Sequence, residues 1–484
     1  MSDDNIDDKN RTEYVASLRS KGGAYYSSYL KIPELLSLQQ PLSRSDAIPN
    51  QEAHDEMLFI IVHQTYELWF KQMLHEIDSV REILSHVPMD DRGIVKCVSR
   101  LHRIIEIQKV MVQQLTILET MSAMDFLAFR DLLFPASGFQ SMQFRLVENK
   151  LGLLSSQRMT YGSTAGGVGR GYCSYLRDSD AEAVALSEKS SSLFDLVEAW
   201  LERTPFMVVS SEKQESQEST SNVIQGIDQK LTTTSETKTS ETIPSSSSSS
   251  STPVAPWLWW THFQDAVFRM LQLDDESFLS NPRLNEAEIA SARKEVAATR
   301  EHFMSVLDAE KYEAARKRGE RRLSHGAMQA ALLITLYHEE PILQLPFLFL
   351  QALLDIDEHL TTWRYRHALM VHRMIGIKLG TGGSAGYYYL RATADRHKIF
   401  GDLFNLSTFL VPHRLLPSLP LDVRARLSFA FGVTGSNDNK DNKDNKDNTS
   451  SVPLSSPSST RVVLTSHPKP SSSDASTTCP FGHS

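Results

Sequence analysis

The sequence lacks any long hydrophobic run. Its longest uninterrupted apolar stretch is Met57–Val62, whereas a helix that crosses a bilayer needs about 20 such residues. We therefore expect no transmembrane helix and no membrane partner. The N-terminus, Met-Ser-Asp-Asp-Asn-Ile-Asp-Asp, is acidic and lacks the apolar core of a secretory leader. These features predict a cytoplasmic protein.

Cysteine is also scarce, and acidic residues outnumber basic ones. Only three cysteines occur, Cys97, Cys173 and Cys479, which excludes a disulfide framework and indicates a reducing compartment. The formal net charge is −9 and no dense basic face is present, which argues against a nucleic-acid partner. Hydrophobic residues make up 40% of 484 positions, enough for a large core.

The alternation of apolar and polar residues that marks a strand is hard to find, whereas helical periodicity dominates. The sequence therefore predicts an all-α fold, a single large helical domain with a pocket between helices. We expect Pro346 in the first turn and Gly380 at the C-cap of one long helix. The expected helical segments are 52–86, 94–121, 181–203, 257–273, 284–318, 324–339, 346–378 and 394–410.

Polar, low-complexity stretches divide this domain. Residues 207–255 are rich in Ser and Thr, and residues 434–484 combine Asn-Lys-Asp repeats with Ser and Pro. Both have too few apolar residues to offset the entropy of ordering, so we expect a disordered insert and a disordered tail. Residues 1–20 are polar and expected to be disordered too. The helical domain then comprises residues 21–206 and 256–433.

One predicted helix carries a histidine on its apolar face. The residues on that face are Phe59, His63, Tyr66, Phe70 and Met73, spaced i, i+4, i+7, i+11 and i+14. A histidine in such a position is more often a buried core residue with one hydrogen bond than a functional group. Taken alone, this helix does not establish a site.

A second predicted helix repeats the pattern with Trp363, His367, Met370 and Met374. His372 follows His367 by five residues, which turns it about 140° away, so the two histidines do not share one metal. A single neutral imidazole among apolar groups suits haem iron better than zinc. Because no Cys-x-x-Cys-His is present, such a haem is held by burial and one ligand.

Two other motifs offer competing interpretations. His54 and Glu56 invite a non-haem iron site, but their place at a helix start favours a role with the helix dipole. The run Gly166–Gly171 has the composition of a phosphate loop without the Lys-Ser/Thr that nucleotides require, which favours a flexible loop.

Several segments, in order along the chain, resemble the tryptophan 2,3-dioxygenase family. The resemblance extends from about Gly22 to Pro412. The segments that carry it are Tyr26–Leu30, His54–Glu82, Asp125–Arg130, Pro135–Lys150, Gly319–Ser324, Trp363–Gly386 and Asp402–Thr408. Departures from the family pattern are confined to the insert, the glycine-rich loop over 161–177 and the tail.

The resemblance implies an enzyme of the kynurenine pathway. Its reaction inserts both atoms of O₂ across the indole C2–C3 bond of L-tryptophan to give N-formylkynurenine. Its cofactor is ferrous haem b, one per subunit, bound between the helices. His367 is implied as the axial iron ligand with Trp363 beside the haem, and His63 as the catalytic residue near the indole N–H. The part before the insert then supplies the distal haem side, and the part after it supplies the axial ligand.

The resemblance also implies the substrate contacts. Arg130 is implied to bind the substrate carboxylate, because a guanidinium fork matches a carboxylate, and Thr381 to touch the ammonium or carboxylate group. Ser137 is implied at the distal haem edge. The aromatic walls around the indole are implied to be Phe59, Phe126, Tyr26 and Tyr29. The family is a homotetramer in which the segment carrying Tyr26 and Tyr29 reaches a neighbouring subunit.

Each assignment competes with a structural role. The alternative role of Arg130 is a helix-terminal salt bridge. For Phe59 and Phe126 the alternative is packing in the core, and for Thr381 it is capping a turn. At the level of function, a haem sensor, a broader indoleamine dioxygenase and a helical scaffold without a cofactor are the competitors. The dipeptide Cys479-Pro480 resembles a haem-regulatory motif, which is too short to carry weight.

Overall fold

The computed structural model describes residues 4–20, 22–44, 52–87, 91–158, 176–204, 258–279, 285–378, 380, 386–420 and 423–424. All regular secondary structure in these ranges is helical, which confirms the all-α fold. The chain divides into two units, Met1–Ala430 and Phe431–Ser484, and the second lies wholly outside the described residues. The insert over 207–255, the tail over 434–484 and the loop Gly166–Gly171 also lie outside them. Within the described ranges, no helix is long and apolar enough to cross a membrane.

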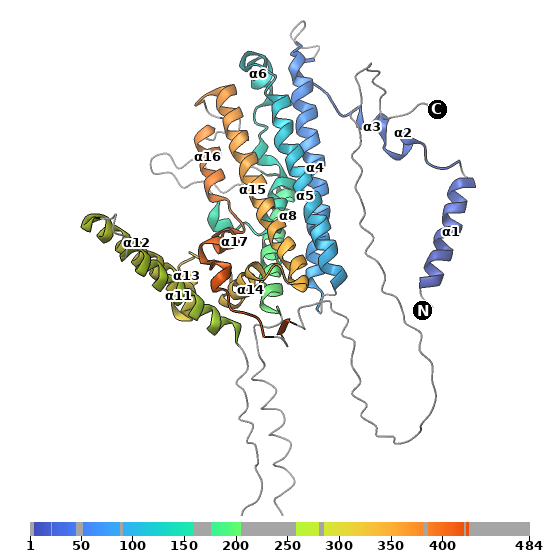
Figure 1. Ribbon diagram of the computed structural model, residues 1–484. Helices are drawn as coiled ribbons and strands as arrows, with labels where there is room; N and C mark the ends of the chain where they lie inside the picture. Colours follow the sequence, from blue (N-terminus) through green and yellow to red (C-terminus); the bar gives the residue numbers. More distant parts are fainter. Residues whose placement is uncertain are drawn as a thin grey trace, which may run out of the picture. The chain divides into compact units, whose positions relative to one another are not determined.

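Three long helices form the centre of the first unit. They are α4 (His54–Ser85), α5 (Asp91–Leu118) and α15 (Pro341–Ile375), and α5 packs against both of the others (Figure 1). Two buried glutamines of α5 join them: the side-chain amide of Gln114 donates to the Val62 carbonyl at 3.3 Å, and that of Gln108 to the Ile356 carbonyl at 3.1 Å. Because a buried amide needs a partner, these bonds favour one register of the three helices.

Shorter helices pack against α4, and their ends are set by local chemistry. The side chain of Ser122 caps α6 (Ala123–Arg130) in a capping box with Asp125. The side chain of Ser141 caps α7 (Met142–Leu151) by accepting from the Phe144 N–H. At the other end of α7, Gly152 has φ of 116°, and a Cβ there would lie 2.6 Å from the Phe194 Cβ. Only glycine fits that junction.

Two segments expected as single helices are each divided in two. The segment 181–203 forms α8 (Asp178–Lys189) and α9 (Leu193–Glu202), and 284–318 forms α12 (Glu286–Leu307) and α13 (Ala309–Lys317). The breaks fall where the side chains of Ser192 and Asp308 accept hydrogen bonds from backbone N–H groups of the next helix. Such side chains compete with helix continuation, so they begin a new helix instead.

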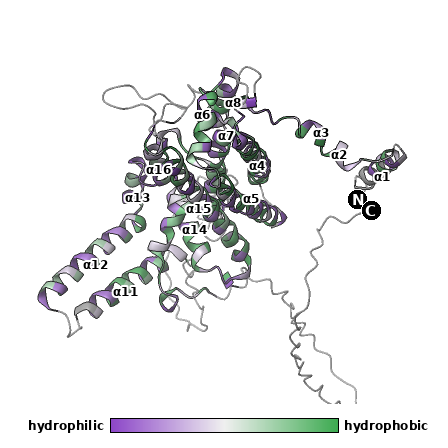
Figure 2. Cartoon of the chain, turned by 90° about the horizontal axis from the view of Figure 1, so that it is seen from above, coloured by the Kyte–Doolittle hydropathy of each residue, from purple (hydrophilic) through white to green (hydrophobic). Residues whose placement is uncertain are grey.

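The remaining helices after the insert are α11, α14, α16 and α17. Figure 2 shows α11 (Trp259–Leu279) and α12 lying beside one another, with hydrophilic and hydrophobic residues alternating along both. By contrast, α14 (His325–Leu336) is buried along most of its length. The segment expected as one helix over 394–410 is instead the end of α16 (Tyr387–Arg396), a break at His397, α17 (Gly401–Phe404) and a 3-10 turn.

The expected bounds of the long C-terminal helix were wrong at both ends. Pro341, and not Pro346, occupies the first turn of α15, and Pro346 lies inside the helix. Its ring removes only the bond to the carbonyl of Ile342, which is itself in the first turn, so the helix continues. At the other end Gly376, with φ of 62°, caps α15 before Gly380 is reached.

The N-terminal residues also differ from expectation. Residues Asp4–Ser20 form helix α1 where loose chain was expected, since no glycine or proline interrupts them. Two short helices follow, α2 (Tyr26–Tyr29) and α3 (Ile32–Leu35). The segment after α3 is attached to α4: both carboxylate oxygens of Glu56 accept backbone N–H bonds, from Leu42 at 2.7 Å and Ser43 at 2.8 Å.

Candidate active site

A cavity of about 330 Å³ lies among α4, α6, α7, α15 and α16. Most of the side chains around it are apolar or aromatic, as is usual for a ligand pocket. The residues predicted from sequence that line it are Phe59, His63, Phe126, Arg130, Ser137, Trp363 and His367. The fold therefore brings together, in one cavity, side chains from both sides of the insert.

Three further residues predicted for the site, Tyr26, Tyr29 and Thr381, are not among those described as lining the cavity. Tyr26 and Tyr29 on α2 do not line the cavity, and their side chains are 73% and 76% exposed. Thr381 lies outside the described residues, although Gly380 and Gly386 on either side of it do line the cavity. His372 does not reach the cavity; its ring stacks on Tyr387 at a centroid distance of 4.3 Å.

His63 is held in one orientation by its own helix. Its Nδ1 atom lies 2.7 Å from the carbonyl oxygen of Phe59, and the two rings are 4.0 Å apart. A carbonyl oxygen only accepts hydrogen bonds, so this contact assigns the proton to Nδ1 and leaves Nε2 as the acceptor. The ring keeps accessible surface toward the cavity, but burial still lowers the pKa of His63, against the opposing effects of the Phe59 carbonyl and Glu67. His63 is therefore neutral at physiological pH.

His367 lies on α15 at the same cavity. Burial, with a smaller contribution from nearby His63, lowers its pKa to about 4. The imidazole is therefore neutral, which is the form that binds a metal. The ring of Trp363, one helical turn earlier, stacks on it at 5.2 Å with an interplanar angle of 14°. Trp363 in turn contacts the rings of Tyr66 and Phe144.

An aromatic wall stands on the His63 side of the cavity. The rings of Phe59 and Phe126 are 5.8 Å apart, and each also contacts Phe129, which is fully buried behind them. The two cavity-lining rings come from different helices, α4 and α6, and Phe129 fixes their separation. Such a wall suits a flat aromatic ligand.

The polar residues of this side are Arg130 and Ser137. Arg130 is half-buried at the last position of α6, where the C-terminal end of the helix dipole favours a cation. Ser137 is half-buried as well, and its hydroxyl accepts the Phe139 N–H at 3.4 Å. Both line the cavity, so the guanidinium of Arg130 and the hydroxyl of Ser137 accompany the aromatic wall.

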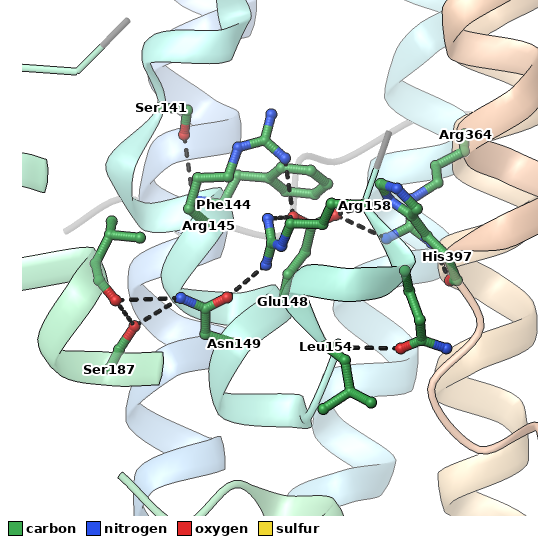
Figure 3. Close-up of polar contacts among 12 residues, drawn as sticks. Ser141, Phe144, Arg145, Glu148, Asn149, Leu154, Arg158, Ser187, Arg364 and His397 are labelled. Carbon is green, nitrogen blue, oxygen red and sulfur yellow. Dashed lines mark hydrogen bonds and ion pairs between the residues drawn. The ribbon is translucent and has the colours of Figure 1, made fainter. Parts of the chain in front are cut away.

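A buried charged cluster forms another part of the cavity wall, and residue-by-residue reasoning from the sequence missed it. Its centre is Glu148 on α7, 1% exposed, which pairs with Arg145 at 2.8 Å, Arg158 at 2.9 Å and Arg364 at 3.0 Å (Figure 3). Despite the opposing effect of burial, these arginines and the nearby His397 ring, whose Nδ1 lies 3.5 Å from a Glu148 oxygen, hold the pKa of Glu148 well below its usual range. Arg145, Glu148 and Arg364 stand in segments quoted for the family resemblance, but His397 carries no sequence signal.

The carboxylate of Glu56 is not placed for the non-haem iron alternative. Both of its oxygens accept backbone N–H bonds from Leu42 and Ser43, and the residue is fully buried. It lies in the first turn of α4, where a carboxylate also favours the helix dipole. Its visible role is to attach the N-terminal segment to α4.

These features together describe a class of site. An apolar cavity between helices presents one neutral imidazole stacked on an indole ring, and a second neutral imidazole that stands beside an aromatic wall. A neutral imidazole in an apolar cavity is a donor that fits haem iron. The fold and the site are thus those of an all-α protein with an apolar, histidine-bearing cavity between its helices.

Comparison with known proteins narrows this class. A family model described as tryptophan 2,3-dioxygenase matches residues 11–243 and 209–410. The tryptophan 2,3-dioxygenase of Dictyostelium discoideum is 43% identical over 412 residues, which covers 85% of this chain and 90% of the relative. That of Bdellovibrio bacteriovorus is 41% identical, covering 84% and 98%, and that of Mus musculus is 40% identical, covering 86% and 89%. The chain belongs to the tryptophan 2,3-dioxygenase family.

Proposed function

We propose that the cavity binds one ferrous haem b through His367 and L-tryptophan on the His63 side. The family oxidises tryptophan with dioxygen to N-formylkynurenine, and the chain is an oxidoreductase of this kind. The observation that supports the proposed site is that His63, Arg130 and His367, far apart in sequence, line one cavity.

The residues fit a haem. His367 is neutral, it lies in an apolar cavity, and its ring is supported by Trp363. Haem, when bound, supplies an iron that activates dioxygen, and the protein supplies position and surroundings. His367 would hold the iron, and Ser137, which lines the same cavity, would donate to the haem edge.

His63 acts on the substrate. With its proton on Nδ1, its Nε2 lone pair is available to accept the indole N–H. This contact orients the indole, and it also allows His63 to take up that proton during the reaction. The rings of Phe59 and Phe126 hold the indole plane and exclude water.

Arg130 selects an amino acid over a simple indole. Its guanidinium pairs with the substrate carboxylate in two parallel hydrogen bonds, and the surrounding apolar wall strengthens that pair. Thr381, by analogy with the family, contacts the other end of the amino acid. This assignment rests on its place between two glycines that line the cavity.

The active form is a homotetramer in which each subunit helps to complete a neighbour's site. Tyr26 and Tyr29 are highly exposed on α2 and lie outside their own cavity. Exposed aromatic residues in a short segment mark a surface for a partner. The partner in this proposal is a second copy of the chain, whose substrate pocket receives these rings.

The test of the proposed function is aerobic turnover by the reduced, haem-loaded protein. N-formylkynurenine is followed by its absorbance, with L-tryptophan and tryptamine as parallel substrates. Rapid product from L-tryptophan and little from tryptamine is the expected result. A normal haem spectrum with no product from either substrate contradicts it and favours a haem sensor.

A further inference from the structure

The charged cluster around Glu148 links the helix of His367 to two other segments of the cavity wall. Arg364 lies one turn before His367 on α15. Its Nη2 donates to the Glu148 carboxylate on α7 at 3.0 Å, and its Nη1 donates to the His397 carbonyl at 3.0 Å, at the end of α16 (Figure 3). Arg364, Glu148 and His397 are 4%, 1% and 2% exposed. One side chain therefore connects three walls of the cavity.

Burying charges at this position is costly unless each is paired. Taking a guanidinium and a carboxylate out of water costs several kcal/mol per ion, and apolar packing of the same volume is often as stable. Stability alone therefore does not explain the cluster. An ion pair of this kind fixes the relative orientation of the segments that it joins, because the two donors of Arg364 fit their two acceptors in one arrangement only.

The His367 ring needs support from its surroundings, because few contacts of its own fix its orientation. Among the described residues the His367 ring makes no hydrogen bond, whereas His63 is tied to the Phe59 carbonyl. A metal-binding histidine usually donates its second ring N–H to a neighbour that fixes its orientation. In this chain the ring is oriented by stacking on Trp363, which precedes Arg364 directly. The position of that turn then decides where the ring lies.

We propose that Arg364, fixed by Glu148 and the His397 carbonyl, is a positioning residue that sets the orientation of the His367 ring. This inference rests on the proposed role of His367 as the iron ligand. A second contact holds the same segments together: the Asp357 carboxylate, two turns earlier on α15, accepts the N–H groups of Ile399 and Phe400 at 2.9 and 3.0 Å. The residues from His397 to Phe400 are thus attached to α15 at two points, and Arg364 is the one beside the ligand.

The test replaces Arg364 by Lys in the full-length protein. Lysine keeps the charge but presents one ammonium, which does not span both acceptors, and Glu148 keeps Arg145 and Arg158 as partners. The haem-loaded ferrous protein is examined by resonance Raman spectroscopy for its iron–histidine stretching band, and haem affinity is measured by titration of the haem-free protein. We expect a shifted or broadened band and an affinity about 10- to 100-fold weaker, the usual effect of changing a residue that supports a metal ligand.

A matched control separates positioning from stability. Glu76 on α4 is also buried, 3% exposed, and pairs with Arg103 at 2.7 Å, but it does not line the cavity. Glu76→Gln should lower the thermal midpoint and leave the band and the haem affinity unchanged. If Arg364→Lys behaves like this control, the cluster is purely structural and the proposal is wrong.

A second variant and a reference complete the design. Arg364→Gln tests the same contact without charge. If neither Arg364 variant folds, the residue is required for the stability of the whole protein, and the proposal is wrong. His367→Ala is measured in parallel. If that variant keeps haem with the parent band, the ligand assignment itself fails, whatever Arg364→Lys does.

Discussion

The Nδ1 atom of His63 donates to the carbonyl oxygen of Phe59 at 2.7 Å, one helical turn earlier on α4. The contact determines which ring nitrogen carries the proton. It also joins the two residues that contact the indole in the proposed complex, so that the base and the aromatic wall move as one piece. The protonation of the ring that faces the cavity follows from this bond.

Replacing His63 with Ala should slow turnover and leave some activity, because the haem iron and dioxygen carry the oxidation. Burial lowers the pKa of His63, so the parent enzyme keeps the neutral ring at pH 7 and loses it only as the pH falls below the usual imidazole range. The kcat/KM of the parent should therefore decline on that acid side, and this decline should be absent in the variant. Steady-state rates across pH check this, and an unchanged rate at every pH would reduce His63 to ordinary packing.

Replacing His367 with Ala should abolish stable haem binding. No other described histidine on α15 is placed to substitute, because neither His359 nor His372 lines the cavity. Titration of the haem-free variant with haem, followed in the Soret region, gives the result. A full haem complement with the parent spectrum would contradict the ligand assignment.

The haem-free protein should become less stable as the pH falls from about 6.5 to 4. The pKa of His367 is about 4 in the folded chain against 6.5 when unfolded, so in this window the unfolded chain binds a proton that the folded chain does not. The free energy of unfolding should fall by up to about 3 kcal/mol from this residue, at 1.36 kcal/mol per pH unit. Above pH 6.5 the ring is neutral in both states and has no effect.

The check on this pH dependence is urea unfolding of the haem-free parent and of His367→Phe at several pH values. Other buried groups titrate in both proteins, so the difference between the two isolates His367. The variant should show a smaller loss in acid, and parallel curves would mean that the ring is not excluded from water as described.

Replacing Arg130 with Ala should cost about 2–5 kcal/mol of transition-state binding, the usual effect of removing one partner of a buried charge pair. That corresponds to a fall in kcat/KM for L-tryptophan of roughly 30- to several-thousand-fold. Tryptamine, which has no carboxylate, is the control, and its turnover should change little. A loss under threefold with L-tryptophan would leave Arg130 as a helix-terminal charge only.

The exposed segment with Tyr26 and Tyr29 should act in a neighbouring subunit. A double variant with both tyrosines changed to Ala should have low activity, because its sites receive defective segments. Arg130→Ala should also have low activity, because its own site is defective. When the two chains are co-expressed, mixed oligomers should regain activity, since intact sites then receive intact segments from the other chain.

The measurement compares purified mixed oligomers, isolated by a different tag on each chain, with the two parents. Activity equal to the average of the parents would show that the segment does not act in trans. Size-exclusion chromatography of the double variant is the control, because a tetramer must still form.

The long helices were predictable because their apolar spacing extends over many turns. Expectation and structure agree within a few residues for α4 and α5, at 52–86 against His54–Ser85 and at 94–121 against Asp91–Leu118. The short helices α6 and α7 were not expected, since in ten residues or fewer the caps decide more than the periodicity. The breaks at Ser192 and Asp308 likewise depend on a hydrogen bond between a side chain and the backbone. The presence of a polar residue in the sequence does not predict that bond.

Some of the cavity residues were predictable from the sequence, and others were not. His63 and His367 stood out because each interrupts an apolar face with one polar group. Glu148 and Arg364 did not, since a charged residue in a helix is usually on the solvated side, and only the fold shows that these two meet. His397 belongs to no pattern at all, and its backbone carbonyl, which no sequence motif encodes, is the part that Arg364 binds.

The bond between Arg364 and Glu148 joins residues 216 positions apart. In the unfolded chain that separation is a loop to be closed, and the entropy of closing it grows only with the logarithm of its length, by about 0.6 kcal/mol for each doubling. The Ser- and Thr-rich residues 207–255 lengthen this loop by much less than a doubling. A chain of this family can therefore acquire a long polar insertion between the two halves of its site with almost no loss of stability. The geometry of the site is maintained by the contacts among its residues.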